Sequence, residues 1–253
     1  MVLKMAWRLV TCILQAFGVR CSNLHSASYF AKEFIVSNAT LSQPGRARVP
    51  GASPMPLLAG AVLAVWLAVV VALGVRGMFT TAPGTPPLPI LLGVLVPLLL
   101  FLAAWRVSAA FRAYVLAADL RFIIAVQGWR AAGFAFLALW AHGILPGMFA
   151  WPAGLGDMAI GFTAPWVLAA LLRQPDFAAS RTFAAWNLFG MLDLVVAVSL
   201  GGLSAFLATG AAGEITTRPM ALMPLILVPA YLVPIFLMLE ITALLQARLM
   251  ARA

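Results

Sequence analysis

From residue 56 onward the chain consists of apolar runs of about twenty residues, and no other feature limits its possible folds as strongly. A helix needs roughly twenty apolar residues to cross the hydrocarbon core of a bilayer. Of the 253 residues 64% are hydrophobic and only 9% are charged, whereas soluble domains carry about 25% charged residues. Backbone groups inside a bilayer must be paired within the protein, which favours helices. The sequence therefore predicts an all-α, polytopic membrane helix bundle.

The apolar runs number six. We predict spans at about residues 56–75, 88–105, 122–145, 156–172, 182–203 and 222–245. Segments rich in proline, glycine or charge separate them, and residues 106–121 suit a helix in the membrane interface. The sixth span contains prolines at 224, 229 and 234. An inner proline frees the carbonyl four residues earlier, which a neighbouring group or a cation can then satisfy.

Basic residues orient this six-span arrangement. One side of the membrane would carry nine arginines: Arg46, Arg48, Arg106, Arg112, Arg121, Arg173, Arg181, Arg248 and Arg252. The other side would carry only Arg76 and Arg218. Because cytoplasmic loops are enriched in Lys and Arg, we predict that both termini are cytoplasmic. The location that we expect is a cell inner (plasma) membrane, with the lipid bilayer as the first partner.

Residues 1–54 differ in composition from the rest of the chain. They contain both cysteines, Cys12 and Cys21, and both lysines. We predict two parts, an N-terminal leader (1–54) and a six-span membrane domain (55–253). The leader is compatible with a disordered or interfacial segment, with an over-extended start whose true initiation lies near Met55, or with a cleaved signal.

Several chemical classes are disfavoured by what the membrane part contains. It has no cysteine, and His142 is its single histidine. Zinc sites and paired haem ligands need several such residues, so we predict no metal and no cofactor. The sixteen Lys and Arg are scattered singly, unlike a nucleic-acid-binding stripe. Asp157 with Asp193 is the only conceivable acid pair, and we place the two at different depths. An enzyme is therefore not expected.

Polar residues within the spans are the candidate functional site. Charged groups inside a bilayer usually face a bundle interior or a wet cavity. At 1.5 Å per residue from the predicted cytoplasmic ends, Gln127, Asn187 and Glu240 would lie about 8 Å deep, Arg130 about 12 Å and Asp193 about 16 Å. Either carboxylate could neutralise Arg130. The five residues form a binding cavity in one interpretation, and a dry network that fixes helix packing in the other.

Asp157 and His142 are predicted near the outer side. Asp157 follows the run Trp151-Pro-Ala-Gly-Leu-Gly and would stand in the first turn of the fourth span, where a carboxylate can cap free amides. Residues 145–155 could instead fold back as a re-entrant lid, provided that protein or water surrounds them. His142 fits an interfacial histidine beside Trp140.

Three patterns carry a resemblance to a known family: Gln127-x-Trp129-Arg130-x-x-Gly133, Leu145-Pro-Gly-x-Phe-Ala-x-Pro-Ala-Gly154-x-Gly-Asp157, and Trp186-Asn187-x-x-Gly190-x-x-Asp193. Together they resemble a family of uncharacterised bacterial multi-span integral membrane proteins. The resemblance covers residues from Met55 to the C-terminus. It implies a bacterial inner-membrane protein and brings no assigned catalytic residues.

Three functions remain open. A small transporter or channel-like protein would have a hydrated cavity around the polar residues, opening toward the cytoplasm. A structural or assembly partner, acting with other membrane subunits or as a homo-oligomer, would have a dry interior in which these residues satisfy one another. A membrane-embedded enzyme would need a nucleophile, a metal set or an acid–base pair that the sequence does not supply.

Overall fold

The computed structural model describes residues 54–251, and these residues form a helical bundle without strands. Six helices are long and apolar enough to cross a membrane, as the sequence predicts. They are α3 (Met55–Val75), α4 (Leu88–Val107), the continuous segment Leu120–Ala141, α8 (Gly147–Arg173), α9 (Arg181–Phe206) and the segment Val228–Met250. Shorter elements are α5 (Ala109–Leu116) and the 3₁₀ helices η2 (Pro175–Ala179) and η3 (Arg218–Ala221).

Two of the six spans combine different helix types. The third consists of α6 (Leu120–Gln127), the 3₁₀ helix η1 (Gly128–Gly133) and α7 (Phe134–Ala141). The sixth consists of the π-helix η4 (Val228–Leu232) and α10 (Val233–Met250). Such irregular stretches inside helices are frequent at functional sites.

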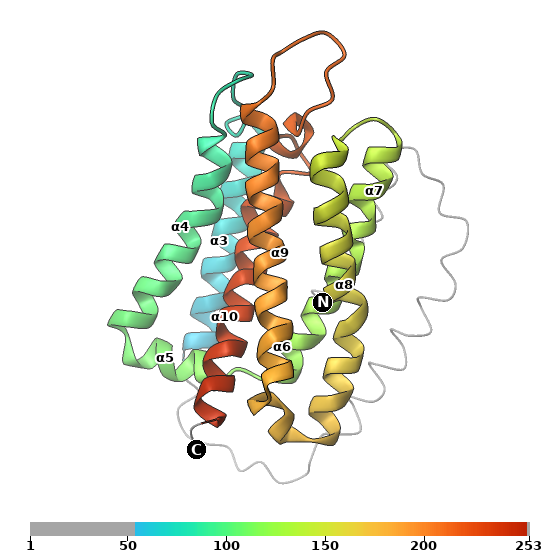
Figure 1. Ribbon diagram of the computed structural model, residues 1–253. Coiled ribbons are helices and arrows are strands. Elements are labelled where there is room, and N and C mark those ends of the chain that lie inside the picture. Colours follow the sequence, from blue (N-terminus) through green and yellow to red (C-terminus); the bar gives the residue numbers. More distant parts are fainter. Residues whose placement is uncertain (1–53, 252–253) are drawn as a thin grey trace, which may run out of the picture. The chain divides into compact units, whose positions relative to one another are not determined.

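The start of α3 and the end of α10 lie at the same end of the bundle (Figure 1). We call this the basal end, and the opposite end, with residues 76–87, 142–146 and 207–227, the loop end. The assignment of the basal end to the cytoplasm stays a prediction. The predicted leader, residues 1–54, lies outside the described residues except for Pro54. At the basal end, α5 runs crosswise to the spans (Figure 1), in the region predicted to hold an interfacial helix.

The fourth span begins earlier than predicted. α8 starts at Gly147 and not near Gly156, because Pro152 and the glycines around it are accommodated within the helix. Proline and glycine are more frequent in membrane helices than in soluble ones, so their presence did not mark a loop. The re-entrant lid proposed for residues 145–155 is therefore wrong. The sixth span starts at Val228 and not at Leu222, because residues 222–226 form a bend and turns after the separate helix η3.

The proline-rich start of the sixth span packs against α3. Pro234 cannot donate to the Ala230 carbonyl, and that carbonyl accepts a hydrogen bond of 3.1 Å from Trp66 Nε1 instead. The hydroxyl of Tyr231 donates to the Leu63 carbonyl over 3.3 Å. A carbonyl predicted to be freed by proline is thus satisfied by a neighbouring helix.

An apolar layer fills the bundle near its basal end. We call it the basal layer, and its buried members are Ile123, Ile124, Leu171, Ala178, Phe183, Ala243 and Ala247. They come from α6, α8, η2, α9 and α10. At the same level of α10, Gln246 Nε2 donates to the carbonyls of Val115 and Ala118 over 3.1 and 2.9 Å, which joins α10 to α5 and the residues that follow it. Apolar packing therefore closes this end of the bundle.

Candidate functional site

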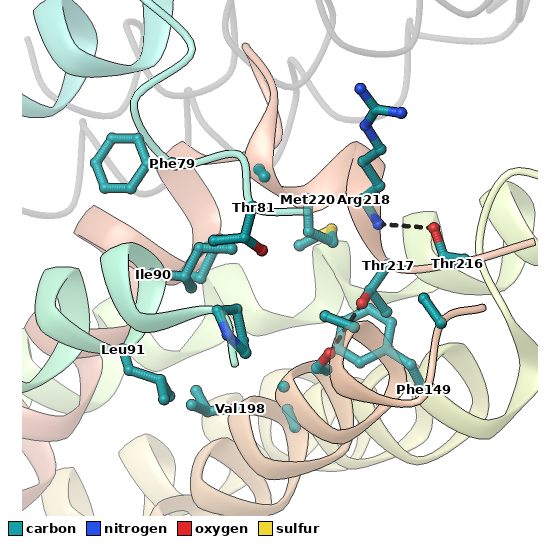
Figure 2. Close-up of a pocket in the computed structure, with 18 of the residues that line it drawn as sticks. Phe79, Thr81, Ile90, Leu91, Phe149, Val198, Thr216, Thr217, Arg218 and Met220 are labelled. Carbon is teal, nitrogen blue, oxygen red and sulfur yellow. Dashed lines mark hydrogen bonds between the residues drawn. The ribbon is translucent and has the colours of Figure 1, made fainter. Parts of the chain in front are cut away.

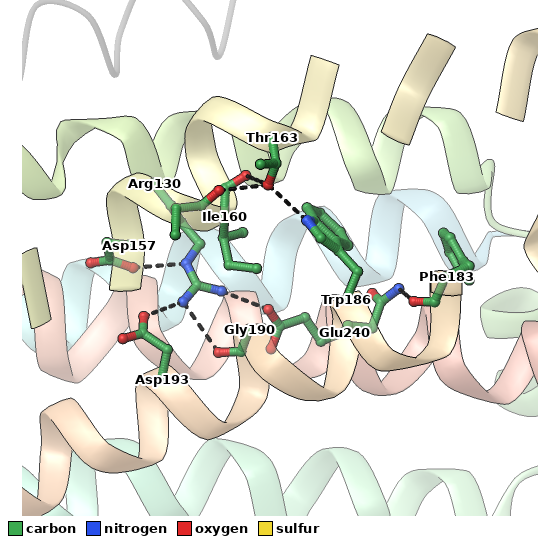
Figure 3. Close-up of polar contacts among 11 residues, drawn as sticks. Arg130, Asp157, Ile160, Thr163, Phe183, Trp186, Gly190, Asp193 and Glu240 are labelled. Atoms are coloured by element: carbon green, nitrogen blue, oxygen red, sulfur yellow. Dashed lines mark hydrogen bonds and ion pairs between the residues drawn. The ribbon is translucent and has the colours of Figure 1, made fainter. Parts of the chain in front are cut away.

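Arg130 is the centre of the polar interior. Its side chain is fully buried and bonds three carboxylates from three other spans. Nε donates to Asp157 Oδ1 over 2.7 Å, Nη1 to Glu240 Oε1 over 2.6 Å, and Nη2 to Asp193 Oδ2 over 2.6 Å. Nη2 also donates to the Gly190 carbonyl over 3.2 Å. Figure 3 shows the guanidinium surrounded by these groups, which we call the Arg130 cluster (Arg130, Asp157, Asp193 and Glu240).

All four members lie near the middle of their spans. Arg130 is residue 11 of 22, Asp157 residue 11 of 27, Asp193 residue 13 of 26 and Glu240 residue 13 of 23. At about 1.5 Å per residue, each is at least about 15 Å from both ends of its span. The prediction that Asp157 and Asp193 lie at different depths is therefore wrong. The early start of α8 is the physical reason, because it carries Asp157 three turns into the helix.

Close approach of the helices makes room for this cluster. A Cβ atom added at Gly156 would overlap the carboxylate of Asp193, and one added at Gly190 would overlap Glu240 Oε1. At Gly161 the added atom would overlap the backbone of Ala131, next to Arg130 in η1. Small residues let membrane helices approach closely. These three glycines therefore hold α8 and α9 near enough for the carboxylates to reach Arg130.

The Arg130 cluster contains more negative than positive groups. Three carboxylates and one guanidinium carry a formal charge of −2 when all are ionised. Isolated charge in a membrane interior is unfavourable unless it is paired or reaches water. Side-chain exposure is 0% for Arg130, 1% for Glu240, 7% for Asp193 and 15% for Asp157. Asp157 is thus the most exposed member of the cluster.

A cavity of about 260 Å³ leads from the loop end to Asp157. Its walls come from α4, α8, α9 and the sixth span, and Figure 2 shows Ile90, Leu91, Phe149 and Val198 among them. Asp157 and Leu194 lie deepest, because they are near the middle of their spans. For a transporter, the sequence predicts a cavity that opens toward the cytoplasm. This one lies at the loop end, which faces outward in the predicted topology.

The rim of the cavity holds two charged residues, Glu214 and Arg218. The Glu214 carboxylate accepts hydrogen bonds from the amides of Thr209 and Gly210, over 2.9 and 2.8 Å. These bonds, with that of the Thr209 amide first, lower the pKa of Glu214 below 4.5. The Arg218 side chain extends away from the other labelled lining residues (Figure 2). Asp157 is the charged lining residue at the inner end of the cavity, away from the rim.

The second oxygen of Asp157 has no partner among residues 54–251, as is also true of Asp193 Oδ1. Asp157 Oδ1 accepts from Arg130, whereas Oδ2 makes no hydrogen bond. Oδ2 is also not among the fully buried unpartnered atoms of the described chain. A carboxylate oxygen that borders a cavity and has no partner can bind a proton or a hydrogen-bond donor.

Gln127 and Asn187 lie close to the Arg130 cluster along the chain but make no hydrogen bond to it. Each is fully buried, three residues before Arg130 and Gly190 respectively. Asn187 Nδ2 donates to the Phe183 carbonyl over 2.9 Å. Both polar atoms of Gln127, Asn187 Oδ1 and Glu240 Oε2 have no partner. The five polar residues predicted to act together are thus divided into three ion-paired residues (Arg130, Asp193 and Glu240) and two amides (Gln127 and Asn187) about one turn nearer to the basal layer.

Asp157 does not have the capping role predicted for it, whereas His142 lies at the loop end, and its role as an interfacial histidine stays a prediction. Asp157 lies within α8 and not in its first turn, so it does not cap the helix. His142 is exposed after the end of α7, with Nδ1 2.8 Å from the Ala138 carbonyl. Among residues 54–251 no group of three or more His, Cys, Asp and Glu could hold a metal ion. The absence of a metal or cofactor from the protein stays a prediction.

Comparison with known proteins gives one match. Residues 87–248 match a family described as a domain of unknown function (DUF8737). No curated protein and no solved structure matches the chain. The matched range extends from the start of α4 almost to the end of α10 and includes every member of the Arg130 cluster. It covers more than half of the 253 residues, and the chain therefore belongs to this family of unknown function.

Proposed function

We propose that the protein is a small transporter or channel-like protein in which the cavity delivers a proton or ligand to the Arg130 cluster. One observation carries this proposal: the cavity ends on Asp157, which also bonds Arg130. A cluster that served only to fix helix packing would not need an accessible carboxylate. The bacterial inner membrane is the location that we propose, from the resemblance of the Arg130, Asp157 and Asp193 patterns.

The two ends of the bundle differ as expected for a transporter with one side open. The cavity reaches the Arg130 cluster from the loop end, while the basal layer is apolar and buried. Movement of a ligand across the membrane would require the basal layer to separate. Gln127 and Asn187 lie between the cluster and this layer, and their unpartnered polar atoms would then become the next polar contacts.

An assembly role is the second candidate, and the completeness of the ion pairing favours it. The guanidinium of Arg130 has four hydrogen-bond partners and no exposed surface. Exposed apolar side chains on α3 and α4 would contact lipid, another membrane subunit or a second copy of the chain. In this case the cluster would stay closed to both sides of the membrane.

Single-cysteine labelling distinguishes these candidates. Cys12 and Cys21 are replaced by serine, and one cysteine is placed at Ala197 in the cavity wall, at Ala243 in the basal layer, or at Val195. The last is a lipid-facing control on α9, with 52% of its surface exposed. A membrane-impermeant thiol reagent is added from each side. We expect Ala197→Cys to react from the loop end and Ala243→Cys to react more slowly from the basal end. Val195→Cys should react from neither side.

Each other pattern rejects the transport proposal. Labelling at Ala197→Cys alone would indicate a one-sided binding protein, because a transporter must expose the basal layer during its cycle. No labelling at either position, in protein that elutes as a single species, would favour the assembly role.

A further inference from the structure

We propose that the cavity binds a monovalent organic cation with a compact apolar body, of which a primary arylalkyl amine is the simplest example. This inference deepens the proposed function and rests on it. Its basis is the combination of an unpartnered carboxylate oxygen on the residue at the inner end of the cavity, excess negative charge behind that carboxylate, and walls that carry no other charged residue between the rim and Asp157.

The charge of the site selects a cation. Three carboxylates share the guanidinium of Arg130, so one ammonium at Asp157 Oδ2 would change the formal charge of the cluster from −2 to −1. An ammonium donates three hydrogen bonds, and a bond between charged partners is roughly twice as strong as a neutral one. An anion in the same place would approach the Asp157 carboxylate, while Arg130 already bonds three carboxylates and one backbone carbonyl.

The walls select an apolar body behind that charge. Between the rim and Asp157 the cavity is lined mainly by aliphatic and aromatic side chains. Phe136 and Phe149 form an edge-to-face pair with ring centroids 5.5 Å apart, and both border the cavity. Aromatic faces attract cations and favour contact with other rings. The volume of about 260 Å³ is slightly below the range of about 300–1,000 Å³ for sites of drug-sized ligands, which indicates a small molecule.

The same walls disfavour an inorganic cation as the ligand. Calcium and magnesium take six or more oxygen ligands or keep much of their hydration shell. At the inner end of this cavity the Asp157 carboxylate is accompanied by Leu194 and Phe136, which supply no oxygen ligand from their side chains. An ammonium group needs fewer partners, and its carbon skeleton gains from burial against apolar side chains.

Phenethylamine is the probe for this inference, with 2-phenylethanol and 3-phenylpropionate as the neutral and anionic counterparts. Binding to the purified protein in lipid nanodiscs is measured by saturation with radiolabelled phenethylamine and by competition with the other two compounds. We expect the amine to bind, and each counterpart to compete at least about thirtyfold more weakly, as for loss of one partner from a buried charge pair.

Three variants locate the site. Asp157→Asn keeps the shape of the side chain and removes its charge, so it should weaken binding by at least about thirtyfold. Val198→Trp should abolish binding by filling the cavity. Asp119→Asn is the matched control, since Asp119 caps α6 at the basal end, asparagine is an equally good cap, and binding should stay within about twofold.

Equal binding of amine and alcohol, or undiminished binding to Asp157→Asn or Val198→Trp, would overturn the inference. So would the absence of amine binding to protein in which Ala197→Cys and Ala243→Cys label as expected, and the transport proposal would then stand with another ligand. If Ala197→Cys does not label from the loop end and the amine does not bind, both proposals fail together.

Discussion

Replacing Arg130 with leucine is expected to prevent stable folding, with a loss of at least about 3–5 kcal/mol in the free energy of unfolding. The substitution removes the only positive group among Asp157, Asp193 and Glu240 and leaves three carboxylates near one another in the membrane interior. Removal of one partner from a buried ion pair is far more harmful than replacement of the whole pair. Lysine should restore only part of the stability, because one ammonium cannot reproduce the planar fork of hydrogen bonds.

The measurement is the yield of monodisperse protein in detergent and its thermal midpoint. Arg173→Leu is the matched control, since Arg173 is exposed at the end of α8 and should change stability by no more than about 0.5 kcal/mol. A quadruple variant tests the cause directly: Arg130→Leu combined with Asp157→Asn, Asp193→Asn and Glu240→Gln should recover much of the yield. An Arg130→Leu protein as stable as the wild type would show that the cluster does not support the fold.

Gly161→Ala should be the next most damaging substitution, with an expected loss of about 3 kcal/mol or more. The added methyl group would overlap the amide nitrogen and Cα of Ala131 and the carbonyl carbon of Arg130. These are backbone atoms, so no side-chain rotation can relieve the overlap. α8 and η1 would have to separate. Because Arg130 is part of η1 and Asp157 is part of α8, the separation would also draw these two residues apart.

Gly128→Ala provides the control for this substitution within η1 itself. A Cβ atom at Gly128 would meet nothing within 4 Å, so alanine should be neutral or stabilise the helix by about 0.5–1 kcal/mol. Both variants are compared by thermal unfolding in the same detergent. A Gly161→Ala protein that unfolds at the wild-type temperature would mean that α8 and η1 are not held as closely as described.

The sequence was sufficient to predict the six spans because their signal is strong and local. Long uncharged runs have few alternatives in a bilayer, and the predicted ends of α3 and α9 lie within a few residues of those found. Arg130, Asp193 and Glu240 could also be selected as candidate partners, since polar groups inside spans must find one another. Their distances and their common contact with Arg130 required the structure.

The role of Asp157 could not be derived, because the start of α8 was misplaced. Pro152, Gly154 and Gly156 are typical turn formers in soluble proteins, and they indicated a loop before Asp157. In this bundle Gly156 is required by contact with Asp193, a relation between helices that local sequence does not contain. One signal for a longer fourth helix was available in the sequence. No Asp, Glu, Lys or Arg occurs between Arg130 and Asp157, so the residues before Asp157 could be part of a membrane helix.

The cavity was beyond sequence analysis for a similar reason. Its lining residues come from segments far apart in the chain, such as Phe79, Phe149 and Val198, and each is an ordinary apolar residue by itself. Apolar periodicity predicts burial but does not distinguish a filled core from a cavity wall. The cavity opens at the loop end, where η3 and the turn held by the Glu214 hydrogen bonds form part of its rim. The sequence does not predict the shape of these loops, so it could not give the side on which the cavity opens.

Solvent access at the two opposite sides of the Arg130 cluster tests the central claim most directly. Cysteine is placed singly at Asp157 and at Glu240, in protein lacking Cys12 and Cys21, and an impermeant thiol reagent is applied from each side. The structure predicts that Asp157→Cys reacts from the loop end only and that Glu240→Cys, fully buried in the native protein, reacts from neither side in the resting state. Protection of Asp157→Cys from both sides, or labelling of Glu240→Cys in the resting state, would contradict a cavity that ends at Asp157.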